Sequence, residues 1–183
     1  GAEQAGEALR AQGYEVSVYP VPAYSTLGLT NFLGGDPLLN TFVRWPEGEL
    51  ARLIFHELAH QVVYASGDTM FNESFATAVE RLGGERWLSQ HASAAARAEY
   101  AALDARRRDF RALTGRTRQQ LEGLYAGDLD DAAKRQRKAE IMARMRADYA
   151  ALKAGPWGGF KGYDPFFEQA NNASLGVQAA YHQ

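Results

Sequence analysis

Two histidines and a glutamate near the middle of the chain have the spacing of a metal site. His56, Glu57 and His60 form the pattern His-Glu-x-x-His inside a helical stretch. Residues four apart lie on one face of an α-helix, so both imidazoles can reach one ion. Glu57 lies about 100° around the helix, where its carboxylate can act as a base without binding the ion. The pattern predicts a zinc site. A chance match is the alternative, and it is rare in a chain with four histidines.

A catalytic zinc ion usually has three protein ligands, so the third must come from elsewhere in the chain. The sequence contains no cysteine, which excludes a thiolate ligand. Glu73, in the next helical stretch, is the predicted third ligand. His91 and the nearly terminal His182 stay open as alternatives. The predicted centre therefore holds one zinc ion per chain through His56, His60 and Glu73.

Two helices are expected to position these residues. The first spans Glu49–Tyr64, and the second is expected to end at Gly83-Gly84. On the second helix, Thr77 and Glu80 lie four and seven residues beyond Glu73, and therefore on the same face. Metal-binding histidines usually donate their other ring N–H to a carboxylate or a carbonyl oxygen. We expect Glu80 to accept such a bond and Thr77 to stand beside it.

The two motifs resemble those of known zinc peptidases. His56–Gln61 followed by Asn72–Glu80 is similar to the paired signature of the gluzincins, the peptidases of the thermolysin and aminopeptidase N kind. Twelve residues separate His60 from Glu73, fewer than in those two families, so the connection must be tighter. A closer resemblance is to a bacterial family of predicted aminopeptidases. It rests on Ala23–Gly28, Asp36-Pro37, His56–Tyr64, Gly67–Glu80 and Asn171–Ala173.

The resemblance implies a zinc-dependent aminopeptidase that hydrolyses peptide bonds, with Glu57 as the general base. Three alternatives stay open: a zinc endopeptidase, a zinc-binding module that has lost catalysis and serves interactions, and a helical scaffold without metal. The resemblance also implies a bacterial periplasmic or cell-envelope protein. An export signal or lipid anchor is then expected upstream of the present sequence.

Length and composition limit the partners of the chain. With 183 residues, of which 46% are hydrophobic, the chain is long enough for one well-packed domain and short for two. A net charge of −2 predicts no attraction to nucleic acid or to an anionic membrane. The sequence shows no apolar run long enough to span a membrane. The predicted partner is a peptide substrate.

The predicted fold class is α+β, mainly α, with a zincin-like core. Tyr14–Tyr19 alternates between polar and β-forming residues and is expected to be a short N-terminal strand. Residues 85–153 are rich in alanine and charge and predict a long helical hairpin, interrupted at Gly115 and at Gly127-Asp128. Residues 1–84 and 154–183 are expected to form the catalytic core of a single domain.

Further residues are expected to contact the substrate. Zinc peptidases commonly hold the substrate backbone along an extended segment. The candidates by position are Ala23, Tyr24, Ser25 and Thr26, and an ordinary scaffold strand is the alternative. Tyr163 and Tyr181 are candidate donors to the oxyanion, although packing in a core is the more common role of tyrosine. Asn172, in an otherwise apolar helical stretch, is a candidate polar contact to the substrate.

Overall fold

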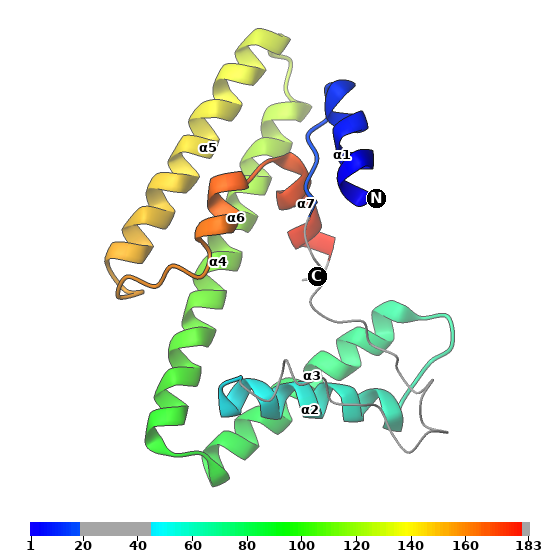
Figure 1. Ribbon diagram of the computed structural model, residues 1–183, viewed down its shortest axis with the longest axis vertical. Helices are drawn as coiled ribbons and strands as arrows, with labels where there is room; N and C mark the ends of the chain where they lie inside the picture. Colours follow the sequence, from blue (N-terminus) through cyan, green and yellow to red (C-terminus); the bar gives the residue numbers. More distant parts are fainter. Residues whose placement is uncertain (19–44, 181–183) are drawn as a thin grey trace. The chain divides into compact units, whose positions relative to one another are not determined.

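The computed structural model describes residues 1–18 and 45–180, with side chains as far as Gly176. All regular secondary structure in these ranges is helical (Figure 1). The helices are α1 (Ala2–Ala11), α2 (Glu47–Val62), α3 (Thr69–His91), α4 (Ala94–Ala126), α5 (Asp131–Ala154), α6 (Asp164–Gln169) and α7 (Asn172–Ala180). Within these ranges, each helix is too short or too polar to cross a lipid bilayer.

The strand predicted at Tyr14–Tyr19 is absent from its described part, which ends at Val18 and has no regular secondary structure. A Cβ atom added to Gly6 of α1 would lie 3.1 Å from Val18 Cγ2 and 3.5 Å from Val16 Cγ1. Asn171 Nδ2 donates a hydrogen bond to the Val16 carbonyl oxygen at 3.3 Å. The alternating pattern thus serves packing against helices instead of a β-sheet. The prediction of an α+β fold with a zincin-like core is wrong.

The chain divides into two compact units. One unit comprises Val21–Asp104, and the other comprises Gly1–Pro20 together with Ala105–Gln183. The predicted single domain, with a core at residues 1–84 and 154–183, stays a prediction.

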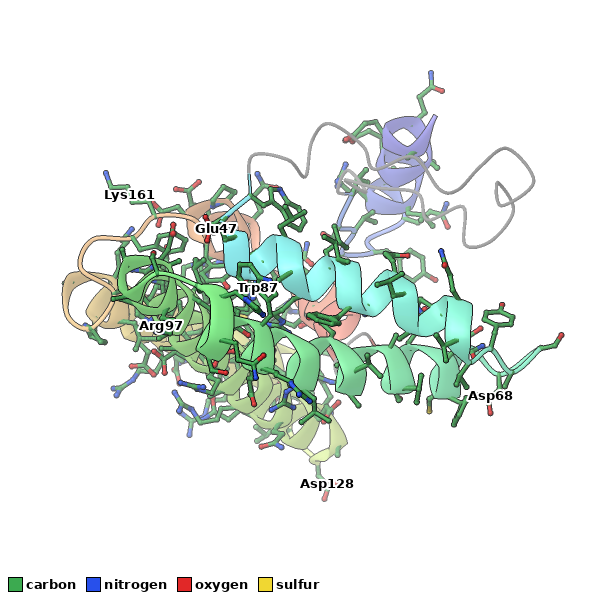
Figure 2. The ribbon with its side chains drawn as sticks, turned by 90° about the horizontal axis from the view of Figure 1, so that it is seen from below. Glu47, Asp68, Trp87, Arg97, Asp128 and Lys161 are labelled. Atoms are coloured by element: carbon green, nitrogen blue, oxygen red, sulfur yellow. The ribbon has the colours of Figure 1, made fainter. Side chains whose placement is uncertain are left out.

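In the first of these units, α2 and α3 form an antiparallel pair joined by a short turn. Asp68 caps α3, because its side chain accepts a hydrogen bond from the Phe71 backbone N–H at 2.9 Å. Figure 2 shows Glu47, at the start of α2, and Trp87, late in α3, at one end of the pair, with Asp68 at the other. Residues early in α3 therefore face residues late in α2.

Two glycines allow α2 and α3 to approach closely. A Cβ atom on Gly83 would lie 2.6 Å from the Phe55 ring, and one on Gly84 would lie 2.6 Å from Arg52 Cγ. The prediction that these glycines end the helix is wrong, because α3 continues to His91. Glycine inside a helix costs about 1 kcal/mol relative to alanine. Here the close packing against α2 offsets that cost.

The other unit is built on the expected helical hairpin, formed by α4 and α5 (Figure 1). The interruption predicted at Gly115 is wrong, because α4 runs through it without a break. The helices α6 and α7 pack against the hairpin, and Trp157, between α5 and α6, donates its indole N–H to Asp109 at 2.8 Å. The core of this unit comprises Phe110, Leu113, Leu121, Met142, Met145, Tyr149, Trp157, Phe167, Ala170 and Leu175.

Candidate metal centre

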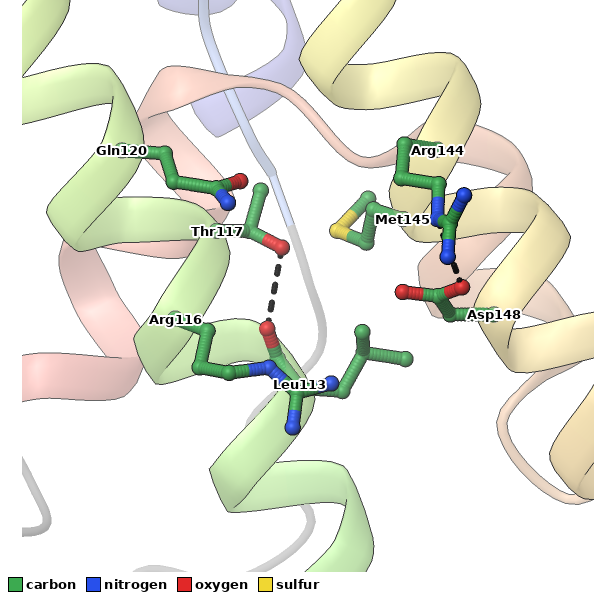
Figure 3. Close-up of a pocket in the computed structure, with 7 residues that line it drawn as sticks. All are labelled: Leu113, Arg116, Thr117, Gln120, Arg144, Met145 and Asp148. Atoms are coloured by element: carbon green, nitrogen blue, oxygen red, sulfur yellow. Dashed lines mark hydrogen bonds and ion pairs between the residues drawn. The ribbon is translucent and has the colours of Figure 1, made fainter.

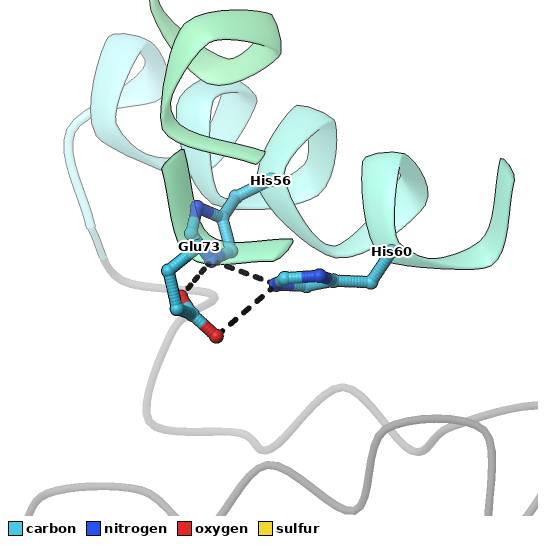
Figure 4. Close-up of side chains that lie close together, drawn as sticks. All are labelled: His56, His60 and Glu73. Carbon is cyan, nitrogen blue, oxygen red and sulfur yellow. Dashed lines mark hydrogen bonds and ion pairs between the residues drawn. The ribbon is translucent and has the colours of Figure 1, made fainter. Parts of the chain in front are cut away.

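Two imidazole nitrogens and one carboxylate converge between α2 and α3 (Figure 4). His56 Nε2 lies 3.2 Å from His60 Nε2 and 3.4 Å from Glu73 Oε2. His60 Nε2 lies 3.7 Å from Glu73 Oε1. Zinc–ligand bonds of about 2.0–2.1 Å in a tetrahedral arrangement place neighbouring ligand atoms about 3.4 Å apart. The donor types and their spacing therefore fit a zinc ion.

Helix geometry and the turn between α2 and α3 bring the three residues together. His56 and His60 lie one turn apart on α2, and Glu73 lies in the second turn of α3. The antiparallel arrangement places this part of α3 opposite the end of α2 that carries both histidines. The His60 side chain is 3% exposed, whereas that of Glu73 is 51% exposed. The three-residue group is thus buried at His60 and open to solvent at Glu73.

Glu80 fixes the orientation of His56. Its Oε2 atom accepts a hydrogen bond from His56 Nδ1 at 3.1 Å. With the proton on Nδ1, His56 turns the lone pair of Nε2 toward His60 and Glu73, which is the tautomer that a metal ligand needs. The hydrogen bond to Glu80 raises the pKa of His56, although burial works in the opposite direction. Sequence spacing had indicated Glu80 for this contact.

The same carboxylate carries a second contact that sequence analysis missed. Arg52 Nη2 forms an ion pair with Glu80 Oε1. Burial would raise the pKa of Glu80, but its hydrogen bond to His56 and the charge of Arg52 lower it below the ordinary value. The available signal was that Arg52 precedes His56 by four residues and so shares its helix face.

The structure places three other predicted residues on these two helices. Glu57 is half-buried on α2, and its charge acts on His56. Thr77 is exposed on α3. His91 is exposed at the end of α3, where its ring lies 6.3 Å from that of Trp87, and it is not part of the three-residue group.

Tyr163 and Asn172 belong to the other unit. The Tyr163 ring stacks on Phe110 with a centroid distance of 4.4 Å. Asn172 donates from Nδ2 to the Tyr125 hydroxyl at 2.9 Å and from its backbone N–H to Glu15 Oε2 at 2.7 Å. The predicted oxyanion and substrate contacts of these two residues stay predictions. The remaining candidates lie outside the described residues: Ala23, Tyr24, Ser25, Thr26, Tyr181 and His182.

A cavity of about 490 Å³ lies between α4 and α5 (Figure 3). Arg144 pairs with Asp148 at 2.9 Å, and Thr117 donates its hydroxyl hydrogen to the Leu113 carbonyl oxygen at 2.9 Å. The full lining comprises Leu113, Arg116, Thr117, Gln120, Arg144, Met145 and Asp148. With one carboxylate and no histidine, this lining lacks the ligand set of a zinc site. Sequence analysis did not predict this cavity.

A comparison with protein families assigns the whole chain. The sequence model of a family described as "Putative aminopeptidase" matches residues 1–183, which include both helices of the candidate centre. Searches of curated proteins and of solved structures gave no match. The family description indicates a peptidase. The chain therefore belongs to the putative aminopeptidase family.

Proposed function

We propose that the chain is a zinc-dependent aminopeptidase in which His56, His60 and Glu73 hold the metal. The convergence of two imidazole nitrogens and one carboxylate carries this proposal. The two Nε2 atoms lie 3.2 Å apart, one Glu73 oxygen lies 3.4 Å from His56 Nε2, and its other oxygen lies 3.7 Å from His60 Nε2. These separations suit a single zinc ion. Two histidines of one helix and a glutamate of the next are the ligand set of the gluzincin type. The family description supports the removal of N-terminal residues from peptides.

Each residue of the site has a separate task in this proposal. A bound zinc ion supplies a Lewis acid for the peptide carbonyl and allows water to ionise near pH 7. Glu57 takes a proton from the attacking water and delivers it to the leaving amine. Glu57 is half-buried, follows His56 directly in the chain and is not part of the three-residue group. Glu80 holds His56 in the binding tautomer.

Zinc content tests the ligand set. Purified wild type is expected to contain about one zinc ion per chain by elemental analysis, whereas Glu73→Ala loses most of it because two histidines alone bind weakly. Glu85→Ala, which changes an exposed glutamate on the same helix, is the matched control and should keep the metal. A wild-type protein that takes up no zinc after reconstitution would overturn the proposal.

Peptides with free and with acetylated N-termini test the reaction class. An aminopeptidase cleaves only the free form, because it binds the α-ammonium group. Equal cleavage of both forms would replace the aminopeptidase by a zinc endopeptidase. A zinc-loaded protein that cleaves neither form would be a binding module.

A further inference from the structure

Three side chains form a line of contacts that begins outside the ligand set. Arg52 pairs with one oxygen of Glu80, and the other oxygen accepts the hydrogen bond from His56 Nδ1 at 3.1 Å. Both oxygens of a single carboxylate are therefore engaged, by two residues of α2 that lie one turn apart. A carboxylate held at both oxygens cannot rotate away from His56 without breaking the ion pair.

Arg52 is itself held in place by its surroundings. Its side chain is 15% exposed, and its guanidinium carbon lies 5.8 Å from the centroid of the Tyr100 ring. The aliphatic stem crosses α3 at Gly84, where a Cβ atom would come within 2.6 Å of Arg52 Cγ. Any side chain at position 84 would therefore displace the stem. The glycine leaves the space in which Arg52 reaches Glu80.

We propose that Arg52 is a positioning residue of the metal centre. It fixes Glu80, which in turn fixes the imidazole of His56 so that Nε2 faces the other two ligands. The inference rests on the proposed function, because it assigns Arg52 a role toward zinc. An ion pair that only joins α2 to α3 would stabilise the fold but leave the zinc affinity of the folded protein unchanged.

Zinc affinity separates these two roles. Arg52→Met keeps most of the stem and removes the charge, and Gly84→Ala keeps the charge and displaces the stem. We expect each variant to bind zinc about 10–100-fold more weakly than wild type, the usual effect of removing a partner of a metal ligand. The measurement is competition with a chelator, after circular dichroism has shown that the metal-free variant is folded. Arg86→Met, at an exposed arginine of α3, is the matched control and should bind as wild type does.

A double variant tests whether Arg52 acts through Glu80. In a Glu80→Gln background, Arg52→Met should weaken zinc binding by less than about threefold, because the carboxylate that it positions is already gone. The inference would be overturned if the losses of zinc affinity caused by Arg52→Met and Glu80→Gln multiplied in the double variant. Wild-type zinc affinity in a folded Arg52→Met or Gly84→Ala protein would also overturn it. Failure of wild type itself to bind zinc would instead refute the proposed function.

Discussion

The exposure of the three candidate ligands differs, and this difference bears on how the site works. The imidazole of His60 is enclosed, and that of His56 is held by Glu80, whereas half of the Glu73 side chain faces solvent. Solvent can therefore reach the candidate ligands from the glutamate side. Glu57, one residue beyond His56, is the acid–base group closest in sequence to the ligands.

Glu57→Gln separates catalysis from metal binding. The amide keeps the size of the side chain but cannot take up a proton at neutral pH. We expect kcat for peptide hydrolysis to fall by about 10²–10⁴-fold, the usual contribution of a general base. Zinc content should stay at the wild-type level, because Glu57 is not a ligand. A variant with full activity would show that another group is the base.

Residue spacing predicted much of this site, and the limits of that prediction have a physical reason. His56, Glu57 and His60 form a motif of five residues, and Glu73 and Glu80 follow at helical intervals. Arg52 belongs to no such motif. An arginine on a helix surface is usually solvated, so its residue type alone does not indicate a role at the site. The spacing of four residues from His56 places Arg52 on the same helix face, but only the structure shows that it pairs with Glu80.

At the scale of elements, the distance between α2 and α3 depends on glycines that sequence analysis interpreted as a helix end. Glycine permits either a chain reversal or a close contact between helices. The sequence alone does not show which of the two a given glycine serves. The pattern of Tyr14–Val18 was ambiguous for a similar reason. Alternation describes which side chains face a packing partner, and here both valines lie against Gly6 of helix α1 and are partly buried.

Gly83→Ala tests the role of close packing. A new Cβ atom would meet the Phe55 ring at 2.6 Å, and such overpacking outweighs the gain in helix propensity. We expect a net loss of about 1 kcal/mol, which lowers Tm by about 2–4 °C in a chain of this size. Gly115→Ala is the control, because no atom outside the neighbouring backbone of α4 lies within 4 Å of its Cβ position. It should gain about 0.5–1 kcal/mol. An increase in Tm for both variants would contradict the packing argument.

At the scale of the whole molecule, both ends of the chain contribute to one unit. Glu15 connects them, because it pairs with Lys138 of α5 and accepts the Asn172 backbone N–H at 2.7 Å. These partners lie 123 and 157 residues away in the sequence. Sequence patterns carry no information about contacts at such separations. The connection was therefore beyond sequence analysis, which indicates Asn172 only as a candidate contact to the substrate.

The pH dependence of stability tests this connection. Burial would raise the pKa of Glu15, but the bonds from Lys138 and the Asn172 N–H lower it below its ordinary value of 4.5. A lowered folded-state pKa means that the stabilisation is present above about pH 4.5 and is lost as the pH falls through the folded-state pKa. Glu15→Gln should therefore unfold more easily than wild type at pH 7, by about 1 kcal/mol or less for a partly exposed pair.

The difference between Glu15→Gln and wild type should disappear below the folded-state pKa, where the wild-type side chain is also uncharged. Urea unfolding at a series of pH values between 7 and 3 measures the free energy of unfolding of wild type and of Glu15→Gln. Glu7→Gln, which removes an exposed charge from α1 in the same unit, controls for the change in net charge. A stability difference between Glu15→Gln and wild type that stays constant over this pH range would contradict the prediction. The charge of the Glu15 carboxylate would then not stabilise the contact between the two ends. The connection would then rest on the hydrogen bond from Asn171 Nδ2 to the Val16 carbonyl oxygen.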